Sequence, residues 1–411
     1  MDQDQANGTD PVRGLARATA DQPAVGAVIR HGASRRARDI SRVNPTPHPR
    51  QGIYYWKCDR PAAFYGLHGR ASEHAPAEIE RLLATALARH FAGERIELRP
   101  GGDQGNHVTF TATIGRRETF IRVEDGPDGD DYMEVEAHLL RKVAQLGVPA
   151  PEVLHVDATR RTVPFAWQVL ENVPFSDLNR LFKAGQLDLA RVAHEIGACV
   201  ARWQAIAPRR FGPLDVAALR SERALRGYHH SYPEYYRLRL DEHLAFLAGK
   251  GFLSRAQIAE IRAEIEHHAP LLELSAGCLV HKDLALWNIL GSPDRIAAFI
   301  DWDDAVAGDP MDDLSLLGCF HDGAVIARAL AGYATIRLLP EEHRRRFWLH
   351  LLRNMIWKAV IRVGAGYFDR TSGFFLIGAG ASGADLRTFT LARLEIALLG
   401  LRADADPATF L

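Results

Sequence analysis

Cysteine is scarce in this chain, with four residues among 411: Cys58, Cys199, Cys278 and Cys319. They are scattered along the sequence, without a CxxC pair and without the spacing of metal ligands, which excludes a disulfide framework or a zinc-ribbon module. This usage is typical of a reducing compartment, where thiols serve as small buried hydrophobic side chains.

Long apolar runs are also missing. No stretch approaches the roughly 20 residues that a membrane-spanning helix needs. The pair Arg35-Arg36 resembles the start of a twin-arginine export signal, but the residues from Asp39 to Pro45 are not the apolar segment that such a signal requires. We therefore expect a cytoplasmic protein that has no membrane partner.

The chain lacks an excess of either charge. Its 50 Lys and Arg residues balance 51 Asp and Glu residues, for a formal net charge of −1. Such a chain has no broad positive field to attract a polyanion, so we expect no nucleic-acid partner. With 47% hydrophobic and 25% charged residues, the composition is that of a globular enzyme long enough for two or three packed units.

Residues 1–75 read as an N-terminal extension. The first 50 or so show no sustained hydrophobic period and are predicted to be a disordered tail. The aromatic groups Tyr54-Tyr55-Trp56 and Phe64-Tyr65 follow. They are too apolar to remain in solvent, so we expect them to pack on the domain that follows.

The hydrophobic pattern sharpens from Pro76 and alternates between helical and strand periods up to residue 172. The predicted order is helix, three strands, helix and two strands: 76–91, 95–98, 108–114, 118–123, 131–146, 152–156 and 163–170. Beyond Glu171 the pattern is mostly helical, at 187–206, 235–247, 255–267, 344–363 and 386–400. One β-rich island, 278–301, interrupts these helices. The sequence predicts an α+β fold with a small mixed β-sheet unit at 76–172 and a larger, mostly helical unit at 173–411.

The β-rich island carries the strongest chemical pattern. It reads as strand, loop, strand, a turn at Ser292-Pro293-Asp294, and a last strand that ends before Asp301. Asn288 and Asp301 would then lie at the same end of one hairpin and offer the hard oxygen ligands that Mg²⁺ prefers. Asp283, five residues before Asn288, is placed to accept a proton from an incoming hydroxyl.

The pattern His281-x-Asp283-x4-Asn288, followed by Ile300-Asp301-Trp302 and by a Gly-Asp-Pro-x-x-Asp-Leu stretch at 308–314, resembles the aminoglycoside phosphotransferase and choline kinase superfamily. These enzymes are distant relatives of protein kinases. The resemblance implies a protein-kinase-like two-lobed fold that uses ATP and Mg²⁺, with Asp283 as catalytic residue and Asn288 and Asp301 as metal ligands. It places nucleotide binding in an N-lobe at 76–172 and catalysis and acceptor binding in a C-lobe at 173–411.

Other residues of the island are predicted to hold the catalytic loop in shape. His281 is expected to point back into the lobe and hold the loop. Asp309 and Asp313 are interpreted as structural, with Asp309 as N-cap and Pro310 as the first residue of a helix. Lys282 stands where the family usually has Gly, and we expect its side chain to extend into solvent.

A nucleotide site needs a turn whose backbone can approach phosphates. Gly101, Gly102 and Asn106 lie in such a turn, which resembles the corresponding turn of the superfamily. It also needs a cation on the third strand, and Arg122 occupies the position where a protein kinase has lysine.

A carboxylate on the following helix should hold that cation. Glu136 shares a helix face with Leu140 and Val143, so it is expected to point inwards and to pair with Arg122. Glu134 lies on another face and is interpreted as a solvated charge. Gln168 and Glu171 end the last strand, where the resemblance places the adenine-binding hinge.

The phosphate acceptor should bind between the catalytic loop and the helices after Gly185. Trp287, Trp302, Asp303, Asp304, His321 and Asp322 lie near this region in sequence, and a tyrosine-rich cluster at 228–236 is a further candidate. Acids and aromatic rings suit a cationic acceptor such as an aminoglycoside or an amino alcohol, and a sugar-like acceptor is also compatible. The competing interpretation is that these aromatic rings are core and these acids are solvated.

Two alternatives to a small-molecule kinase remain open. In the first, Lys282 and Arg122 mark a regulatory pseudokinase that binds nucleotide without turnover. In the second, the chain is a protein Ser/Thr kinase, although it lacks an activation segment with an Ala-Pro-Glu ending.

Overall fold

A five-stranded sheet forms the first part of the computed structural model, which describes residues 48–60, 72–101, 107–371 and 382–411. Its strands lie in the order β1-β2-β3-β5-β4, and each neighbouring pair is antiparallel. In chain order they are β1 (Ile96–Pro100), β2 (Val108–Ile114), β3 (Arg117–Glu124), β4 (Val153–Asp157) and β5 (Ala166–Glu171). All five predicted strands are confirmed to within a few residues, because their alternating or continuous apolar residues are bounded by turns.

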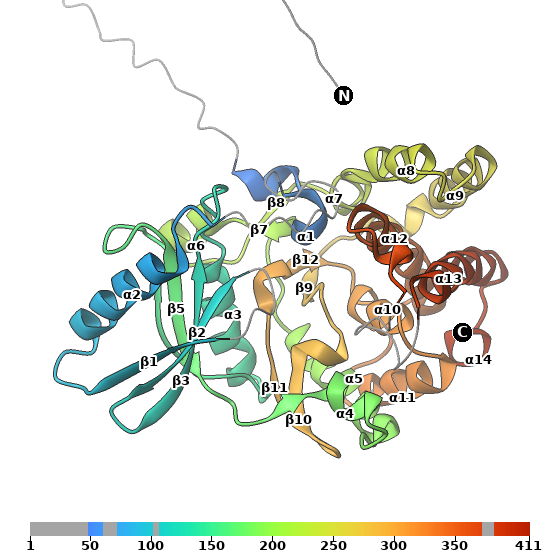
Figure 1. Cartoon of the computed structure of the whole chain (residues 1–411). Helices are drawn as coiled ribbons and strands as arrows, with labels where there is room; N and C mark the ends of the chain where they lie inside the picture. The colour runs from blue at the N-terminus through green and yellow to red at the C-terminus, as the bar shows by residue number, and fades with distance from the viewer. Residues whose placement is uncertain (1–47, 61–71, 102–106, 372–381) are drawn as a thin grey trace, which may run out of the picture. The chain divides into compact units, whose positions relative to one another are not determined.

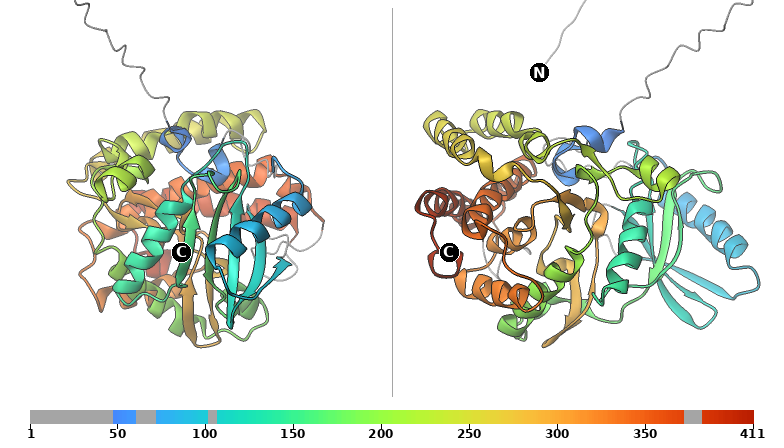
Figure 2. Two further views of the ribbon diagram at one scale, coloured as in Figure 1. Left: turned by 90° about the vertical axis from the view of Figure 1, so that its left-hand side faces the viewer. Right: turned by 180° about the vertical axis from the view of Figure 1, so that it is seen from behind.

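Two helices cover the two faces of this sheet (Figures 1 and 2). Helix α2 (Pro76–His90) packs on the face that presents Ile121 and Val123. Helix α3 (Met133–Gln145) lies on the other face. Since side chains alternate across a strand, Arg122 points to the α3 side.

Beyond residue 173 the chain is mainly helical, as predicted. The long helices are α5 (Leu189–Trp203), α9 (Arg255–His267), α11 (Gly323–Ala334), α12 (His343–Gly364) and α13 (Gly383–Ala403). The shorter ones are α4 (Leu178–Lys183), α6 (Val216–Glu222), α7 (Tyr232–Arg237), α8 (Leu240–Gly249), α10 (Asp312–Gly318) and α14 (Pro407–Phe410), with 3-10 turns η3 (Ala269–Leu272) and η6 (Tyr367–Asp369). The single helix predicted at 235–247 is two helices, because Arg239 adopts the left-handed conformation with φ 59°.

Two small sheets are set among these helices. One has the order β11-β10-β6 and contains β6 (Ser176–Asp177), β10 (Ile289–Ser292) and β11 (Arg295–Phe299). The other has the order β8-β7-β12-β9 and contains β7 (Phe211–Leu214), β8 (Gly227–His229), β9 (Cys278–Val280) and β12 (Val306–Gly308). The sequence predicted only β9, β10 and β11, since β6, β7, β8 and β12 are too short for a hydrophobic period to show.

The aromatic patch of the N-terminal extension packs on the helical part of the molecule. It carries a 3-10 turn, η1 (Pro49–Gly52), and a short helix, α1 (Trp56–Asp59). The Tyr55 ring stacks on Trp357 of α12, and the Tyr54 ring stacks on Tyr235 of α7. The predicted packing is therefore confirmed for Tyr54, Tyr55 and Trp56, whereas Phe64 and Tyr65 lie outside the described residues.

The predicted tail lies almost entirely outside the described residues. Within the described part of the chain, no helix is both long enough and apolar enough to cross a bilayer. All four cysteines are buried free thiols, as their spacing predicted.

Candidate active site

The hairpin of β10 and β11 brings the predicted catalytic residues together. Ile289 pairs with Phe299 at the open end of this hairpin, so Asn288 and Asp301 flank one end of it. Asn288 closes the 3-10 turn η4 (Leu286–Asn288). Asp301 has a left-handed backbone with φ 65° and precedes a second turn, η5 (Trp302–Asp304). The predicted placement of these two residues is confirmed.

Asp283 and Asn288 are in direct contact. The Asn288 amide nitrogen donates hydrogen bonds to the Asp283 main-chain oxygen at 2.8 Å and to its Oδ2 at 3.0 Å, which leaves the amide oxygen for another partner. Burial alone would raise the pKa of Asp283, but the nearby cations Lys57 and Lys358 hold that pKa below its usual value. Asp283 is therefore a buried, ionised carboxylate.

Lys57 of α1 lies at the centre of the site, where the sequence did not predict it. Its ammonium nitrogen is 2.6 Å from Oδ2 of Asp283, 3.2 Å from Oδ2 of Asp301 and 3.3 Å from Oδ2 of Asp304. Although burial lowers the pKa of Lys57, these carboxylates raise it well above its ordinary value, so the lysine is charged. A single lysine in a four-residue helix carries no periodic signal, and only its tertiary contacts reveal it.

The catalytic loop is braced by Asp313 of α10. One carboxylate oxygen accepts a hydrogen bond from the main-chain nitrogen of His281 at 2.9 Å, and the other accepts one from Lys282 at 3.0 Å. Trp203 donates a further hydrogen bond from its indole nitrogen at 3.0 Å. His281 is fully buried and lies 3.0 Å from the carbonyl oxygen of Ile300 through Nε2, which agrees with the predicted bracing roles of His281 and Asp313.

Lys282 does not extend into solvent, and that prediction was wrong. Its side chain is fully buried, and the ammonium contacts Oδ2 of Asp312 at 2.6 Å, the Tyr54 hydroxyl at 3.0 Å and Oδ1 of Asn354 at 3.3 Å. The left-handed backbone of Lys282, with φ 69°, turns the side chain inwards. A buried lysine is tolerated here because carboxylate and hydroxyl oxygens surround the charge.

The predicted helix start at Asp309 and Pro310 was also wrong. Helix α10 begins at Asp312, and Asp309 instead accepts a hydrogen bond from the Met311 main-chain nitrogen at 2.8 Å. Its other carboxylate oxygen pairs with Arg346 at 2.5 Å. The structural interpretation of Asp309 is therefore right, but an ion pair with α12 replaces the predicted helix cap.

Arg122 and Glu136 form the predicted inward pair. The Arg122 Nη1 atom lies 2.5 Å from Oε1 of Glu136, and Nη2 lies 3.0 Å from Oδ1 of Asp301. Gln168, the cross-strand neighbour of Arg122, donates from its side-chain nitrogen to Oε2 of Glu136 at 2.6 Å. Glu134 lies nearer the surface, as expected, but it is paired with Arg220 at 2.6 Å.

The other residues that were predicted to bind the nucleotide are less well placed to contact it through their side chains. Glu171 is exposed and accepts a hydrogen bond from the Glu152 main-chain nitrogen at 3.2 Å. Gly101 is closely covered, since a Cβ atom there would lie 2.4 Å from Oγ1 of Thr109. Gly102 and Asn106 lie outside the described residues, so the structure does not describe the turn itself.

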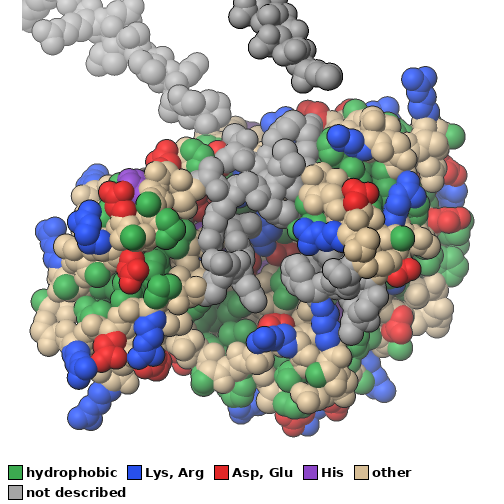
Figure 3. All heavy atoms as spheres, in the orientation of Figure 1, with side chains coloured by type: hydrophobic (Ala, Val, Ile, Leu, Met, Phe, Trp, Pro, Cys, Tyr) green, Lys and Arg blue, Asp and Glu red, His purple; other side chains and the backbone are tan. Residues whose placement is uncertain are grey.

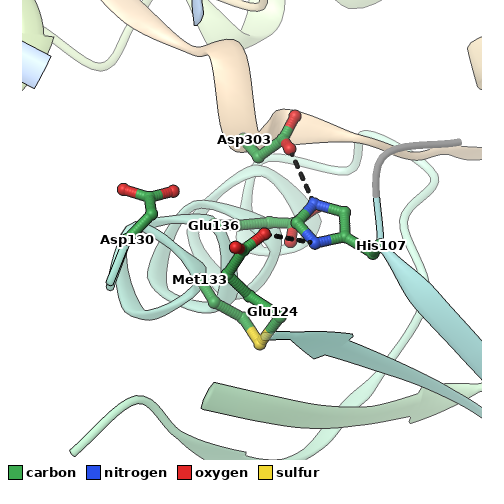
Figure 4. Close-up of a pocket in the computed structure, with 6 residues that line it drawn as sticks. All are labelled: His107, Glu124, Asp130, Met133, Glu136 and Asp303. Carbon is green, nitrogen blue, oxygen red and sulfur yellow. Dashed lines mark hydrogen bonds and ion pairs between the residues drawn. The ribbon is translucent and has the colours of Figure 1, made fainter. Parts of the chain in front are cut away.

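His107, just after that turn, links β3 to the catalytic segment (Figure 4). Its ring lies between Glu124 and Asp303, with Nδ1 3.1 Å from one carboxylate and Nε2 3.0 Å from the other. Burial lowers the pKa of His107, but its hydrogen bonds to these two acids raise it to about 9, so the ring is an imidazolium. The sequence did not single out His107, because its partners are 17 and 196 residues away.

The oxygen atoms around Asp301 are of the kind that a divalent cation binds, although in this structure Lys57 and Arg122 contact the Asp301 carboxylate. Asp301 supplies a carboxylate, Asn288 an amide oxygen, and Asp304 a carboxylate that is buried. Neither oxygen of Asp304 accepts a hydrogen bond from the described residues, although Oδ2 lies at ion-pair distance from Lys57. Such a set of hard oxygen ligands suits Mg²⁺.

The predicted aromatic acceptor residues divide into two groups. Tyr232, Tyr235, Tyr236 and Trp302 are fully buried and belong to the hydrophobic core. Trp287 is only half-buried, and its ring meets Phe320 edge to face with centroids 4.9 Å apart. On the face shown in Figure 3, acidic and basic side chains are interspersed, which accords with the small net charge.

Solved structures with a similar fold cover most of this chain. The apo form of a thermostable mutant of aminoglycoside phosphotransferase APH(4)-Ia is 19% identical, with a TM-score of 0.55, over 79% of this chain and 99% of that one. A ternary complex of such a mutant with AMP-PNP and hygromycin B is 18% identical, with a TM-score of 0.56, over the same shares of the two chains. At this identity the likeness establishes the kinase-like two-lobed α+β fold and nothing finer.

No curated protein matches the sequence. A family model does match, described as the phosphotransferase enzyme family, and it covers residues 97–348. That range contains most of β1, all of β2 to β5, the catalytic loop, the β10–β11 hairpin and the start of α12. On this match, over more than half its length, the chain belongs to the phosphotransferase enzyme family.

Proposed function

We propose that this protein transfers the γ-phosphate of ATP to a hydroxyl group of a small molecule and that the reaction depends on Mg²⁺. One observation carries the proposal: Asp283 and Asp301 meet around a single ammonium group, and Asp301 also contacts the Arg122–Glu136 pair of the sheet lobe. A carboxylate base, a hard-oxygen site and a buried arginine thus come together where the two lobes meet. Phosphoryl transfer depends on positioning and on electrostatic stabilisation, and this combination can provide both.

Asp283 is the proposed catalytic residue. Its carboxylate is ionised, and Asn288 fixes its orientation by donating to Oδ2. It would accept the proton of the acceptor hydroxyl while that oxygen bonds to the γ-phosphorus and the bond from this phosphorus to the β,γ-bridging oxygen breaks. The leaving group is then ADP.

Asn288 and Asp301 are the proposed metal ligands. Asp304 offers a further carboxylate, which like that of Asp301 lies at ion-pair distance from Lys57. A bound Mg²⁺ would neutralise the charge on the phosphate oxygens. Arg122 keeps its charge under all conditions and can exchange its contact with Asp301 for a phosphate oxygen, while Glu136 and Gln168 hold it in place.

We assign the remaining nucleotide contacts to the sheet lobe, residues 76–172. Gly101, Gly102 and Asn106 would bring main-chain groups to the phosphates, and the strand end from Gln168 to Glu171 leads into the adenine hinge. The helical lobe, residues 173–411, then supplies the catalytic residues and the acceptor pocket. A protein of the same fold has been solved in a ternary complex with AMP-PNP and hygromycin B, which supports nucleotide and small-molecule binding as such.

Lys57 is a further proposed catalytic residue, although it belongs to the N-terminal extension. Its ammonium faces the gap between the base and the metal ligand, which the transferred phosphoryl group must cross. A fixed positive charge at that position stabilises the negative charge on the phosphoryl oxygens in the transition state. The extension from residue 48 to 60 is thereby a part of the active site.

The competing function is a nucleotide-binding module without turnover, in which Lys57 permanently satisfies the carboxylates. An Asp283→Asn variant separates the two. For an enzyme, this change abolishes ATP-dependent phosphorylation of acceptors while ATP binding, measured by calorimetry, is retained. If the wild-type protein binds ATP but consumes none of it with a broad panel of hydroxylated metabolites and antibiotics, the enzyme proposal fails.

A further inference from the structure

Three basic side chains are buried beside the catalytic loop without an acidic partner. Lys358 and Arg362 lie one turn apart on α12, and Arg393 lies on α13, which packs against α12. Their exposed fractions are only 6%, 4% and 8%. Among the residues that the structure describes, no carboxylate lies within ion-pair distance of any of the three.

The close contacts that these cations make with described residues are with neutral groups, although the pKa of Arg393, which burial lowers, is raised by Asp322. The Lys358 ammonium lies 4.1 Å from the centroid of the Trp357 ring and 4.6 Å from that of Phe320. Arg362 donates to the Thr390 hydroxyl at 2.8 Å, and Arg393 donates to the His321 carbonyl at 3.1 Å. Each cation therefore retains hydrogen-bonding capacity that the protein does not use.

Other buried cations near the site do have acidic partners. A carboxylate oxygen lies 2.6 Å from Lys282, 2.6 Å from Arg50 and 2.5 Å from Arg122. Burying a charge is costly unless it is paired, so an unpaired group of three needs an explanation.

The three cations converge on one place next to the base. Lys358 and Arg393 both reach the residues that follow α10, since the Lys358 ammonium lies 4.6 Å from the Phe320 ring and Arg393 donates to the His321 carbonyl at 3.1 Å. Arg362 lies one turn from Lys358 on α12, and all three cations lower the pKa of the nearby Cys319 thiol, whose own burial raises it. Lys358 also helps to keep Asp283 ionised, which places it within electrostatic reach of the reacting carboxylate. Burial lowers the pKa of Lys358 to about 8 and that of Arg362 to about 10, which shows how poorly the protein alone compensates these charges.

We propose that Lys358, Arg362 and Arg393 form an anion-binding subsite of the acceptor pocket, so that the acceptor carries a carboxylate or phosphate group beside its reactive hydroxyl. This inference rests on the proposed function and sharpens it. Arginine and lysine together offer the planar and point-charge donors that bind such oxyanions. An aminoglycoside, which carries protonated amines, would be repelled from the same position.

The test compares hydroxylated carboxylic acids as acceptors, each paired with its own amide, which has the same shape but no negative charge. Kanamycin serves as a cationic acceptor. Phosphorylation is followed by ADP release from the full-length protein. Phosphorylated alcohols form a second arm, which distinguishes a phosphate from a carboxylate as the recognised group. We expect acidic acceptors to be phosphorylated in preference to their amides by about tenfold or more in kcat/KM.

Anion binding is measured separately with inorganic phosphate and D-glycerate as probes, through the fluorescence of Trp357 and Trp287 and through calorimetry. In Lys358→Met and Arg362→Met, we expect both probes to bind about tenfold more weakly. Arg402→Met, which removes a positive charge from the exposed part of α13, is the matched control and should leave binding unchanged.

Thermal melting without ligand distinguishes a binding role from a structural one. Removing an unpaired buried charge should leave the melting temperature of Lys358→Met at or above that of the wild type. The inference is overturned if the variant melts lower and binds the probes normally, or if amides or kanamycin are the preferred acceptors. If the probes bind but no acceptor is phosphorylated, the subsite stands and the proposed function fails.

Discussion

The ammonium of Lys57 lies 2.6 Å from Oδ2 of Asp283, although 226 residues separate them along the chain. The contact joins a short helix of the N-terminal extension to the proposed catalytic base. Around it, Arg50 pairs with Asp130 at 2.6 Å and donates to the Asp303 main-chain oxygen at 2.5 Å. The extension is thus tied to both lobes at the point where they meet.

Replacing Lys57 by Met should lower kcat roughly 100-fold, because a positive charge that faces the transferred phosphoryl group is lost. Steady-state assays at saturating ATP and Mg²⁺ measure the effect. Lys57→Arg, which keeps the charge, should recover a part of the rate. A faster Lys57→Met enzyme, or one that needs less Mg²⁺, would instead mean that Lys57 blocks the metal site.

Replacing Glu136 by Gln should destabilise the protein by about 3 kcal/mol, because the buried guanidinium of Arg122 loses its main partner. The new amide group would also face the amide nitrogen of Gln168, which now donates to the carboxylate. The KM for ATP should rise at the same time. Glu134→Gln on the same helix is the matched control and should cost less than about 1 kcal/mol, because its pair with Arg220 is solvent-exposed. Urea unfolding measures both, and equal effects at the two positions would contradict the inward role of Glu136.

Replacing Lys282 by Met should cost roughly 3–5 kcal/mol, because Asp312 is then left as an uncompensated charge in the core. The same substitution at the exposed Lys250 should change stability by less than about 0.5 kcal/mol. Tyr54→Phe, which removes only the hydroxyl contact with Lys282, should cost about 1 kcal/mol. A small effect at Lys282 would show that its ammonium is not part of the packed core.

The pH dependence of acceptor use should report on Lys358. Burial lowers its pKa to about 8, and Arg362 and Lys57 lower it further, whereas Cys319 and Asp283 raise it. The kcat/KM for an acidic acceptor should therefore fall as the pH rises through about 8, when the ammonium loses its proton. In Lys358→Arg that fall should be absent, and a decline of the same size with the neutral amide would assign it to another group.

The free energy of unfolding should rise with pH over the same range in which kcat/KM falls. The folded-state pKa of Lys358 lies below its ordinary value, so between about pH 8 and 10.5 the unfolded chain binds more protons than the folded one. Stability should consequently rise with pH in that window, and Lys358→Met should lack this contribution. Urea unfolding of the two proteins at pH 7.5 and pH 10 tests this difference.

The sequence alone was sufficient for features with a local or periodic signature. The strands that present Arg122, the inward face of α3 with Glu136, and the hairpin between Asn288 and Asp301 all follow from hydrophobic spacing and turn residues. The resemblance at 281–301 then supplied the chemistry. These features are determined locally, because each depends on residues within one or two neighbouring elements.

Tertiary structure decided which charges meet. Lys282 was expected in solvent and is buried against Asp312. Lys57 reaches Asp283 from a segment in which only the aromatic residues had been singled out from the sequence. Lys358 and Arg362 belong to a helix that is buried on most sides, and nothing in its pattern shows that acids are absent around them. The physical reason is that a charge is assigned to solvent, to an ion pair or to a ligand by its long-range neighbours, which periodicity does not encode.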